Sequence, residues 1–243
     1  MTVFEQNLAN YSSAWSVAEY TREAGLRQIE RELIDVFMPR PPAQVLDIGC
    51  GAGRTTVGLV DAGFQVTAID LAQPLLDHAR TRRPDIDYRV MNATRLELPD
   101  RSFDAALFSY NGIDVIFPLA DRRRCLAEVR RVLRPGGIFI LSTHNFIGHL
   151  FSGGYFYLRG YRHAAGMLAA QIRNPHVRDW YVRYDDPGGV QLLYSAPPSR
   201  TRAQLSETGF EVLDVRGATG ERNAGRVRMR QPHVYFVARR HPS

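Results

Sequence analysis

A glycine-rich turn preceded by an acidic residue is the first feature of the sequence that could do chemistry. Residues 47–53 read Asp-Ile-Gly-Cys-Gly-Ala-Gly. Gly49, Gly51 and Gly53 permit a tight turn and a close approach of a ligand to the backbone, and the helix that follows offers free N–H groups. The spacing G-x-G-x-G differs from the dinucleotide fingerprint G-x-G-x-x-G. Asp47 would repel a pyrophosphate and attract a sulfonium or amino group, which favours S-adenosylmethionine (SAM) over NAD.

A second carboxylate, Asp70, ends the strand predicted at residues 66–70. At that position a carboxylate can accept hydrogen bonds from both hydroxyls of a ribose. The alternative is a charge at the N-terminus of the helix that begins near Pro74. We favour the ribose contact.

Polar residues also follow two later predicted strands. Ligands of open α/β sheets lie at the carboxyl ends of the strands, which points to Tyr110 and Asp114 after one strand and to His144 after the next. His144 is the best-placed general base for a hydroxyl acceptor. It could equally hydrogen-bond to loop backbone, and Asp114 could be a turn residue. Because no CxxC or HxxxH spacing occurs, we expect no metal site.

Short apolar runs that alternate with helical patterns must position these residues, and this alternation is typical of βαβ units and a parallel sheet. Apolar residues from Leu26 to Phe37 recur at helical spacing, so a helix precedes the first strand. Strands are expected at 44–48, 66–70, 88–90, 103–109, 138–143, 210–215 and 233–239. The alternation breaks down between about 145 and 198. The sequence predicts a doubly wound, Rossmann-like α/β domain with an insertion after its fifth strand.

Four segments (45–56, 66–80, 92–104 and 133–143) resemble successive motifs of the class I SAM-dependent methyltransferases of the small-molecule type. The resemblance covers roughly residues 43–145. It implies a seven-stranded, mostly parallel sheet with an antiparallel last strand, and SAM as the cofactor. The residues implied to bind SAM are Asp47, Gly49, Gly51, Gly53, Asp70, Leu71, Asn92, Ala93, Ser109 and Tyr110. Family members often carry Asp-Ala where this chain has Asn92-Ala93. An amide oxygen can still accept from the adenine amino group, so we expect binding to survive.

We expect a single domain over residues 1–243. Residues 1–40 would form an N-terminal helical lid, 41–144 the cofactor-binding core, 145–198 an acceptor lid and 199–243 the C-terminal strands. Aromatic residues in the insertion suggest an apolar acceptor pocket, and they are Phe151, Tyr155, Phe156, Tyr157, Tyr161, Trp180, Tyr181, Tyr184 and Tyr194. They could also pack the insertion onto the sheet or form the surface of a homodimer. Tyr11 and Tyr20 are candidates to fold over SAM.

The basic charge of the chain comes entirely from arginine. All 31 basic residues are Arg, against 25 acidic residues. Arg122, Arg123 and Arg124 begin an arginine-rich stretch that we interpret as the solvated side of one helix, whose apolar side is formed by Cys125 and its neighbours. No aromatic residues alternate with these arginines, so we expect no nucleic acid partner.

The chain also lacks the signatures of export and of membrane insertion. No apolar run approaches the roughly 20 residues of a membrane-spanning helix, and residues 1–12 lack the layout of a secretory signal. Cys50 and Cys125 make no disulfide framework. We expect a cytoplasmic protein without a membrane partner.

Together these patterns predict an enzyme that transfers a methyl group from SAM to a small-molecule acceptor in a biosynthetic pathway. Proximity and orientation can supply most of the rate, because SAM carries a good leaving group. The alternatives are a NAD-dependent oxidoreductase, an RNA or protein methyltransferase, and a non-catalytic SAM-binding module. The acceptor, and whether its nucleophile is O, N or C, stay open.

Overall fold

The computed structural model describes residues 2–151, 165, 166, 168, 169, 171, 172, 174–186 and 189–242. At its centre is a seven-stranded sheet in the order β3-β2-β1-β4-β5-β9-β8. The strands are β1 (Gln44–Ile48), β2 (Gln65–Asp70), β3 (Asp87–Val90), β4 (Phe103–Phe108), β5 (Leu133–His144), β8 (Phe210–Gly217) and β9 (His233–Arg240). Strand β9 pairs antiparallel with both β5 and β8, whereas the other pairings are parallel. This confirms the predicted sheet with an antiparallel last strand.

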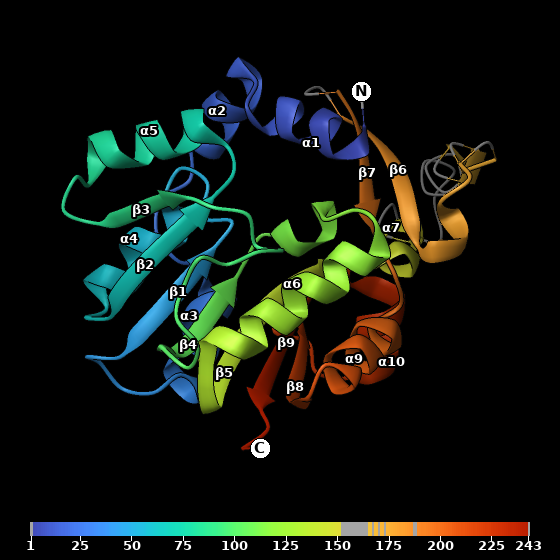
Figure 1. Cartoon of the computed structure of the whole chain (residues 1–243). Coiled ribbons are helices and arrows are strands. Elements are labelled where there is room, and N and C mark those ends of the chain that lie inside the picture. Colours follow the sequence, from blue (N-terminus) through green and yellow to red (C-terminus); the bar gives the residue numbers. More distant parts are fainter. Residues whose placement is uncertain are drawn as a thin grey trace.

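Helices cover both faces of the sheet (Figure 1). One face packs against α3 (Gln28–Phe37) and α4 (Arg54–Asp61), and the other against α6 (Leu119–Val132), α9 (Pro198–Glu207) and α10 (Ala224–Arg230). Successive side chains of a strand point to opposite faces, so Ala105 and Leu107 of β4 face the first layer while Ala106 and Phe108 face the second. Burial on both faces explains why β4 reads as a continuous apolar run.

Two further helices, α1 (Val3–Tyr11) and α2 (Ala14–Tyr20), lie across the edge of the sheet where the parallel strands end (Figure 1). Helix α1 begins with a capping box in which Thr2 and Glu5 satisfy each other's backbone N–H groups. The Asn7 amide donates to the carbonyl of Val115 (3.1 Å), in the segment after β4, and to that of Leu192 (3.3 Å), in the insertion, so it joins α1 to both. Helix α2 also contacts α5 (Gln73–Arg82).

The insertion contains regular structure that the sequence pattern did not predict. It includes α7 (Phe146–Phe151), a short 3-10 helix η2 (Val177–Asp179) and an antiparallel hairpin of β6 (Tyr181–Asp186) and β7 (Gly189–Tyr194). Tyr181 and Tyr194 face each other across the hairpin and are fully buried. The Tyr181 hydroxyl donates to the Ile116 carbonyl at 2.6 Å. These two aromatics therefore pack the insertion onto the domain, one of the alternatives left open above. Tyr155, Phe156, Tyr157 and Tyr161 lie outside the described residues.

Arg122 on α6 overturns part of the interpretation of the arginine-rich helix. Its side chain is fully buried. Its guanidinium donates to Asp114 Oδ1 at 2.8 Å and to Gln204 Oε1 at 3.1 Å, and lies 4.1 Å from the centre of the Tyr194 ring. The placement of Arg122 on the solvated side is wrong, because α9 and the insertion cover that part of α6. Within the described residues, no helix is long and apolar enough to cross a membrane.

Candidate functional site

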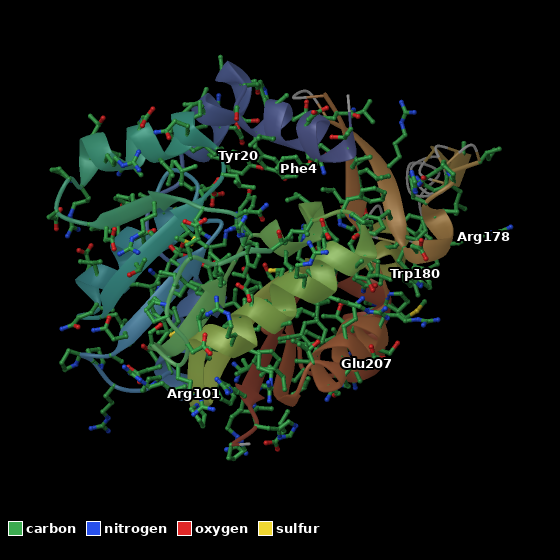
Figure 2. The ribbon with its side chains drawn as sticks, in the orientation of Figure 1. Phe4, Tyr20, Arg101, Arg178, Trp180 and Glu207 are labelled. Carbon is green, nitrogen blue, oxygen red and sulfur yellow. The ribbon has the colours of Figure 1, made fainter. Side chains whose placement is uncertain are left out.

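A cavity of about 210 Å³ opens at the carboxyl ends of β1, β2 and β4, beneath α1 and α2. Eight of the ten predicted cofactor residues line it: Gly49, Gly51, Asp70, Leu71, Asn92, Ala93, Ser109 and Tyr110. The N-terminal helices contribute Phe4, Asn7, Tyr11 and Tyr20. Figure 2 shows Phe4 and Tyr20 beneath these helices, on the side that faces the sheet. The structure thus brings together residues that lie far apart in the sequence.

The glycine turn joins β1 to α4 and forms one wall of this cavity. Gly49 has φ +63°, and a Cβ added there would lie 2.7 Å from the Phe108 ring. Gly53 has φ +83°, and its Cβ would lie 2.7 Å from the Tyr88 hydroxyl. A side chain at either position would therefore meet both backbone strain and a steric clash. Gly53 does not line the cavity, so its contribution is to the shape of the turn.

Asp47 lies beneath the turn and does not line the cavity. It is 1% exposed, and its Oδ2 accepts hydrogen bonds from the hydroxyls of Thr55 (2.7 Å) and Thr56 (2.6 Å). Burial raises the pKa of the Asp47 carboxyl to about 6. These contacts tie the first turn of α4 to the end of β1. The predicted contact of Asp47 with a cationic end of SAM stays a prediction.

Asp70 reaches the cavity from the end of β2. Its two oxygens accept the backbone N–H groups of Gly51 and Ala72, both at 2.8 Å. Burial raises the pKa of the Asp70 carboxyl. Each carboxylate oxygen can accept a second hydrogen bond, so Asp70 can hold the glycine turn, satisfy an N–H at the start of α5 and still bind hydroxyls.

Asn92 lines the cavity but already has partners for its amide oxygen. Oδ1 accepts from the backbone N–H and from the hydroxyl of Thr94, both at 2.9 Å. An amide oxygen has two lone pairs. The predicted adenine contact would have to share them with Thr94, and it stays a prediction.

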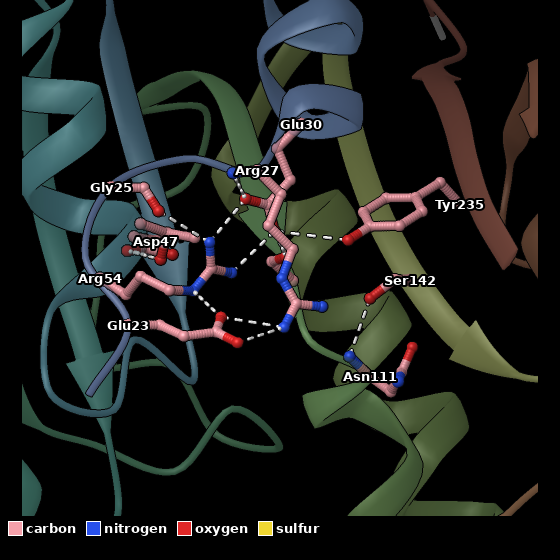
Figure 3. Close-up of polar contacts among 11 residues, drawn as sticks. Glu23, Gly25, Arg27, Glu30, Asp47, Arg54, Asn111, Ser142 and Tyr235 are labelled. Atoms are coloured by element: carbon pink, nitrogen blue, oxygen red, sulfur yellow. Dashed lines mark hydrogen bonds and ion pairs between the residues drawn. The ribbon is translucent and has the colours of Figure 1, made fainter. Parts of the chain in front are cut away.

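A buried ion-pair network supports the glycine turn from the side of α3, and sequence reasoning did not identify it (Figure 3). Arg54, the first residue of α4, donates to both oxygens of Glu30, each at 2.7 Å, and to the carbonyl of Gly25 at 2.9 Å. Glu23 lies 4.0 Å from Arg54 Nε and also binds Arg27 at 2.9 Å. Arg54 and Glu23 line the cavity. One wall therefore presents a guanidinium and a carboxylate side by side.

Glu30 is the centre of this network. It is fully buried on α3, and it also accepts hydrogen bonds from the hydroxyls of Ser109 and Tyr235. Burial alone would raise the pKa of the Glu30 carboxyl. The hydrogen bonds and positive charge of Arg54, with the hydrogen bond from Ser109, lower it by more, so this pKa lies below its usual value. A signal was present in the sequence, because Glu30 stands on the apolar face of its helix, four residues after Leu26. A charge on a core-facing position is expected only where it is paired.

Tyr110 follows β4 with an unusual backbone. Tyr110 and Asn111 both have positive φ, +54° and +61°, and non-glycine residues with this conformation are uncommon and cluster at functional sites. The Tyr110 ring is partly exposed in the cavity wall, with Arg27 4.4 Å from its centre and Tyr20 edge-on at 5.7 Å. Tyr110 thus connects the strand ends with the N-terminal helices.

The other two predicted catalytic residues, Asp114 and His144, are paired with each other and do not line the described part of the cavity. Asp114 lies in the 3-10 turn η1 (Gly112–Val115), and its Oδ2 accepts from the backbone N–H of His144 at 2.6 Å and contacts Nδ1 at 2.9 Å. His144 lies beside His149 and His233. Burial lowers the pKa of His233 to about 4. The base role of His144 stays a prediction.

The core of the chain matches one known domain family, described as "Methyltransferase domain", over residues 46–141. The chain is 35% identical over 116 residues to a demethylmenaquinone methyltransferase of Renibacterium salmoninarum, which is 48% of this chain and 47% of that protein. It is 34% identical over 143 residues to a malonyl-[acyl-carrier protein] O-methyltransferase of Serratia marcescens, which is 58% of this chain and 54% of that protein. The chain thus spans about half the length of these relatives.

The fold also matches solved structures. A SAM-dependent methyltransferase from Methanosarcina mazei superposes with a TM-score of 0.67 at 22% identity, over 90% of this chain and all of that one. At that level of identity the likeness is one of fold. This structural match covers 90% of the chain, well beyond residues 46–141, which match the domain family.

Proposed function

We propose that the chain, whose residues 46–141 match a methyltransferase domain family, is a class I SAM-dependent methyltransferase that transfers a methyl group from SAM to a small-molecule acceptor in a biosynthetic pathway. The family and its fold use SAM as the methyl donor. One observation carries the proposal: a single cavity joins the glycine turn, Asp70 and Asn92 to an apolar compartment under the N-terminal helices.

In this proposal SAM lies across the carboxyl ends of the strands. Asp70 accepts the ribose hydroxyls, and Asn92 lies at the adenine end. The methionine end lies against the glycine turn, where Arg54 can bind a carboxylate and Glu23 an ammonium group. Support comes from the opposite charges of these two side chains, which match the two charged groups of an amino acid.

The remaining wall of the cavity fits a small, mainly apolar acceptor. It is formed by Phe4, Leu8, Val115, Ile116 and Phe117, with Asn7 and Asp121 as polar exceptions. Apolar linings with a few polar groups are typical of small-molecule sites. The two named relatives act, by their names, on demethylmenaquinone and on a malonyl group carried by a protein, so acceptors differ within the family.

Methyl transfer from SAM needs alignment of nucleophile, methyl carbon and sulfur more than it needs a strong base. Tyr110 and Ser109 line the cavity next to the turn that would hold the methionine end, so the walls themselves can set this alignment. We therefore assign the main part of catalysis to positioning. The identity of the nucleophile decides whether a base contributes.

The decisive experiment is incubation of the purified chain with methyl-labelled SAM and fractionated small-molecule extracts, followed by mass identification of labelled products. We expect a low-molecular-weight product that is heavier than its precursor by one methyl group, and we expect the Asp70→Ala variant to form it more slowly when SAM is below saturation. Label transferred only to RNA or protein would contradict the small-molecule acceptor. Tight binding of S-adenosylhomocysteine with no labelled product in any fraction would favour a non-catalytic SAM-binding module.

A further inference from the structure

Three histidines from three separate elements meet outside the cavity described above. His144 is the last residue of β5, His149 lies in α7 and His233 is the first residue of β9. Each offers a ring nitrogen, and these nitrogens all lie within 4.8 Å of one another. The ring centres are 5.2 to 5.5 Å apart. A small movement of the rings would bring their nitrogens to the spacing of ligands around one ion.

The fold fixes this meeting point. His144 and His233 are register partners in the antiparallel pair of β5 and β9. Helix α7 starts directly after β5, and the His149 N–H donates to the Asn145 carbonyl at 2.9 Å. The Asn145 amide in turn donates to the Gln231 carbonyl at 2.9 Å. The three imidazoles are thus carried by hydrogen-bonded backbone and not by independent loops.

Asp114 orients one of the three rings. Its Oδ2 accepts the backbone N–H of His144 and lies 2.9 Å from Nδ1, which places the imidazole proton on Nδ1 and a lone pair on Nε2. Asp114 is itself fully buried and held by Arg122 at 2.8 Å. A carboxylate behind an imidazole is the usual partner of a metal-binding histidine, because it fixes the tautomer and the ring orientation.

Asn111 marks a point that two of the three imidazoles, those of His144 and His233, face with their lone pairs. Its Nδ2 lies 2.8 Å from His233 Nδ1 and 3.5 Å from His144 Nε2. Because the amide nitrogen can only donate, both ring nitrogens face it with lone pairs. The amide oxygen of Asn111 is buried and has no hydrogen-bond partner among the described residues. A half turn of the amide would direct this oxygen to the same point and exchange a donor for a metal ligand.

We propose that His144, His149 and His233 form a binding site for a divalent transition-metal ion, Zn(II) in the first place, with Asp114 as the positioning carboxylate and the Asn111 oxygen as a further ligand. Neutral imidazoles suit Zn(II) and its neighbours, and three protein nitrogens leave a fourth coordination position that the Asn111 oxygen can take. The expectation of no metal site rested on close spacing along the chain, whereas β5, α7 and β9 bring these ligands together from distant positions. This inference does not depend on methyl transfer.

The test is a titration of the full chain, freed of metal with a chelator, with Co(II) alone. We expect visible absorption bands of a Co(II)–imidazole site, saturation at one ion per chain and displacement by Zn(II). His149→Ala and His233→Ala should each weaken Co(II) binding at least about 100-fold, because each removes a ligand. Asp114→Asn should weaken it by about 10- to 100-fold. Zn(II) should raise the melting temperature of the wild type and leave that of the ligand variants unchanged.

His241→Ala is the matched control, because this exposed histidine lies near the C-terminus and outside the cluster. It should bind Co(II) as the wild type does. The proposal is overturned if the folded wild type develops no bands at millimolar Co(II), whatever the variants do. It is also overturned if the wild type, His149→Ala and His233→Ala bind Co(II) with the same affinity. Circular dichroism establishes that each variant tested is folded.

Discussion

At the scale of single residues, the site depends on carboxylates whose surroundings give them different tasks. Asp70 reaches the cavity and keeps acceptor capacity for a ligand. Asp47 is enclosed by two hydroxyls and ties α4 to β1. Glu30 is fully buried but paired by Arg54. Because their surroundings differ, Asp70 is tested by ligand affinity and Asp47 by the pH dependence of stability.

Asp70→Ala should weaken binding of S-adenosylhomocysteine by about 1–3 kcal/mol, the cost of removing a charged acceptor from its hydrogen bonds. Asp77→Ala on the exposed side of α5 is the control and should bind as the wild type does. Calorimetry measures both. Because Asp70 also holds Gly51, an analogue without ribose hydroxyls is needed to separate the two roles. If Asp70→Ala weakens both ligands equally, Asp70 acts on the loop and not on the ribose.

Asp47 predicts a specific dependence of stability on pH. Its pKa is about 6 in the folded chain, above its usual value of 3.8, so the folded state binds this proton more tightly than the unfolded state. The contribution of Asp47 to the free energy of unfolding is therefore greatest below about pH 4 and is lost as the pH rises through about 6. Above that pH it no longer changes. The shift corresponds to about 3 kcal/mol.

Urea unfolding of the wild type and of Asp47→Asn, compared from about pH 4 to about pH 8, measures this contribution. The free energy of unfolding of the wild type should fall relative to that of the variant over the predicted window. Groups other than Asp47 titrate in both proteins and cancel in the difference. A constant difference across the range would mean that Asp47 titrates normally.

At the scale of elements, the sequence predicted most of the sheet, because strands that are buried on both faces read as apolar runs between glycine turns and helices. The strand that carries His144 is longer than predicted, since β5 begins at Leu133 rather than at 138. The hairpin of β6 and β7 was missed because its residues pack against α1, η1 and η2, so its pattern reflects these neighbours and not a regular alternation.

The eight lining residues of the cofactor side were predicted from motifs, whereas Glu30 and Arg54 were not. Their pairing joins α3 to α4 across 24 positions of the chain, and no local pattern encodes such a contact. The predicted exposure of Arg122 was wrong for the same reason, because helical periodicity does not show that α9 covers one side of α6. The sequence therefore predicts elements and motif positions better than it predicts which charges the packing buries.

Arg122→Met should destabilise the fold by about 3–5 kcal/mol, because it leaves the Asp114 carboxylate buried without its cation. Arg123→Met is a matched control on the same helix, since the Arg123 side chain is 58% exposed and should change stability by less than about 0.5 kcal/mol. Chemical unfolding of the two variants gives the comparison. Equal stabilities would show that the Asp114–Arg122 pair contributes nothing that methionine cannot replace.

At the scale of the whole molecule, the basic charge bears on possible partners, and two exposed arginines of α6 lie beside acidic residues. Arg123 faces Glu207 at 3.7 Å, and Arg124 faces Asp121 at 3.2 Å. A nucleic acid site requires cations that are free to contact phosphates along one face. That the basic charge has no nucleic acid partner stays a prediction, and Arg123 and Arg124 are the residues at which to test it.

RNA binding to the wild type should accordingly be weak and should not change when Arg123 and Arg124 are both replaced by glutamine. Filter binding or fluorescence anisotropy at several salt concentrations measures the affinity and its salt dependence. Micromolar, salt-dependent binding that is lost in the double variant would instead assign α6 to a nucleic acid interface.

The N-terminal helices cover the cavity, with Tyr11 and Tyr20 packed against a cluster that includes Ala52 of the glycine turn, and we predict that these helices respond to the cofactor. Residues 3–20 should exchange amide hydrogens more slowly once S-adenosylhomocysteine is bound, because Tyr11 and Tyr20 line its cavity. Asn7→Ala removes two hydrogen bonds that hold α1 to Val115 and Leu192, so amide exchange in α1 should become faster. Binding of S-adenosylhomocysteine should weaken about 10-fold, because each lost bond costs about 1 kcal/mol or somewhat less. Gln6→Ala removes a single bond to Val190 and should have a smaller effect. If S-adenosylhomocysteine does not change the exchange rates of residues 3–20, and Asn7→Ala binds it with wild-type affinity, then α1 and α2 are fixed parts of the fold and not a lid.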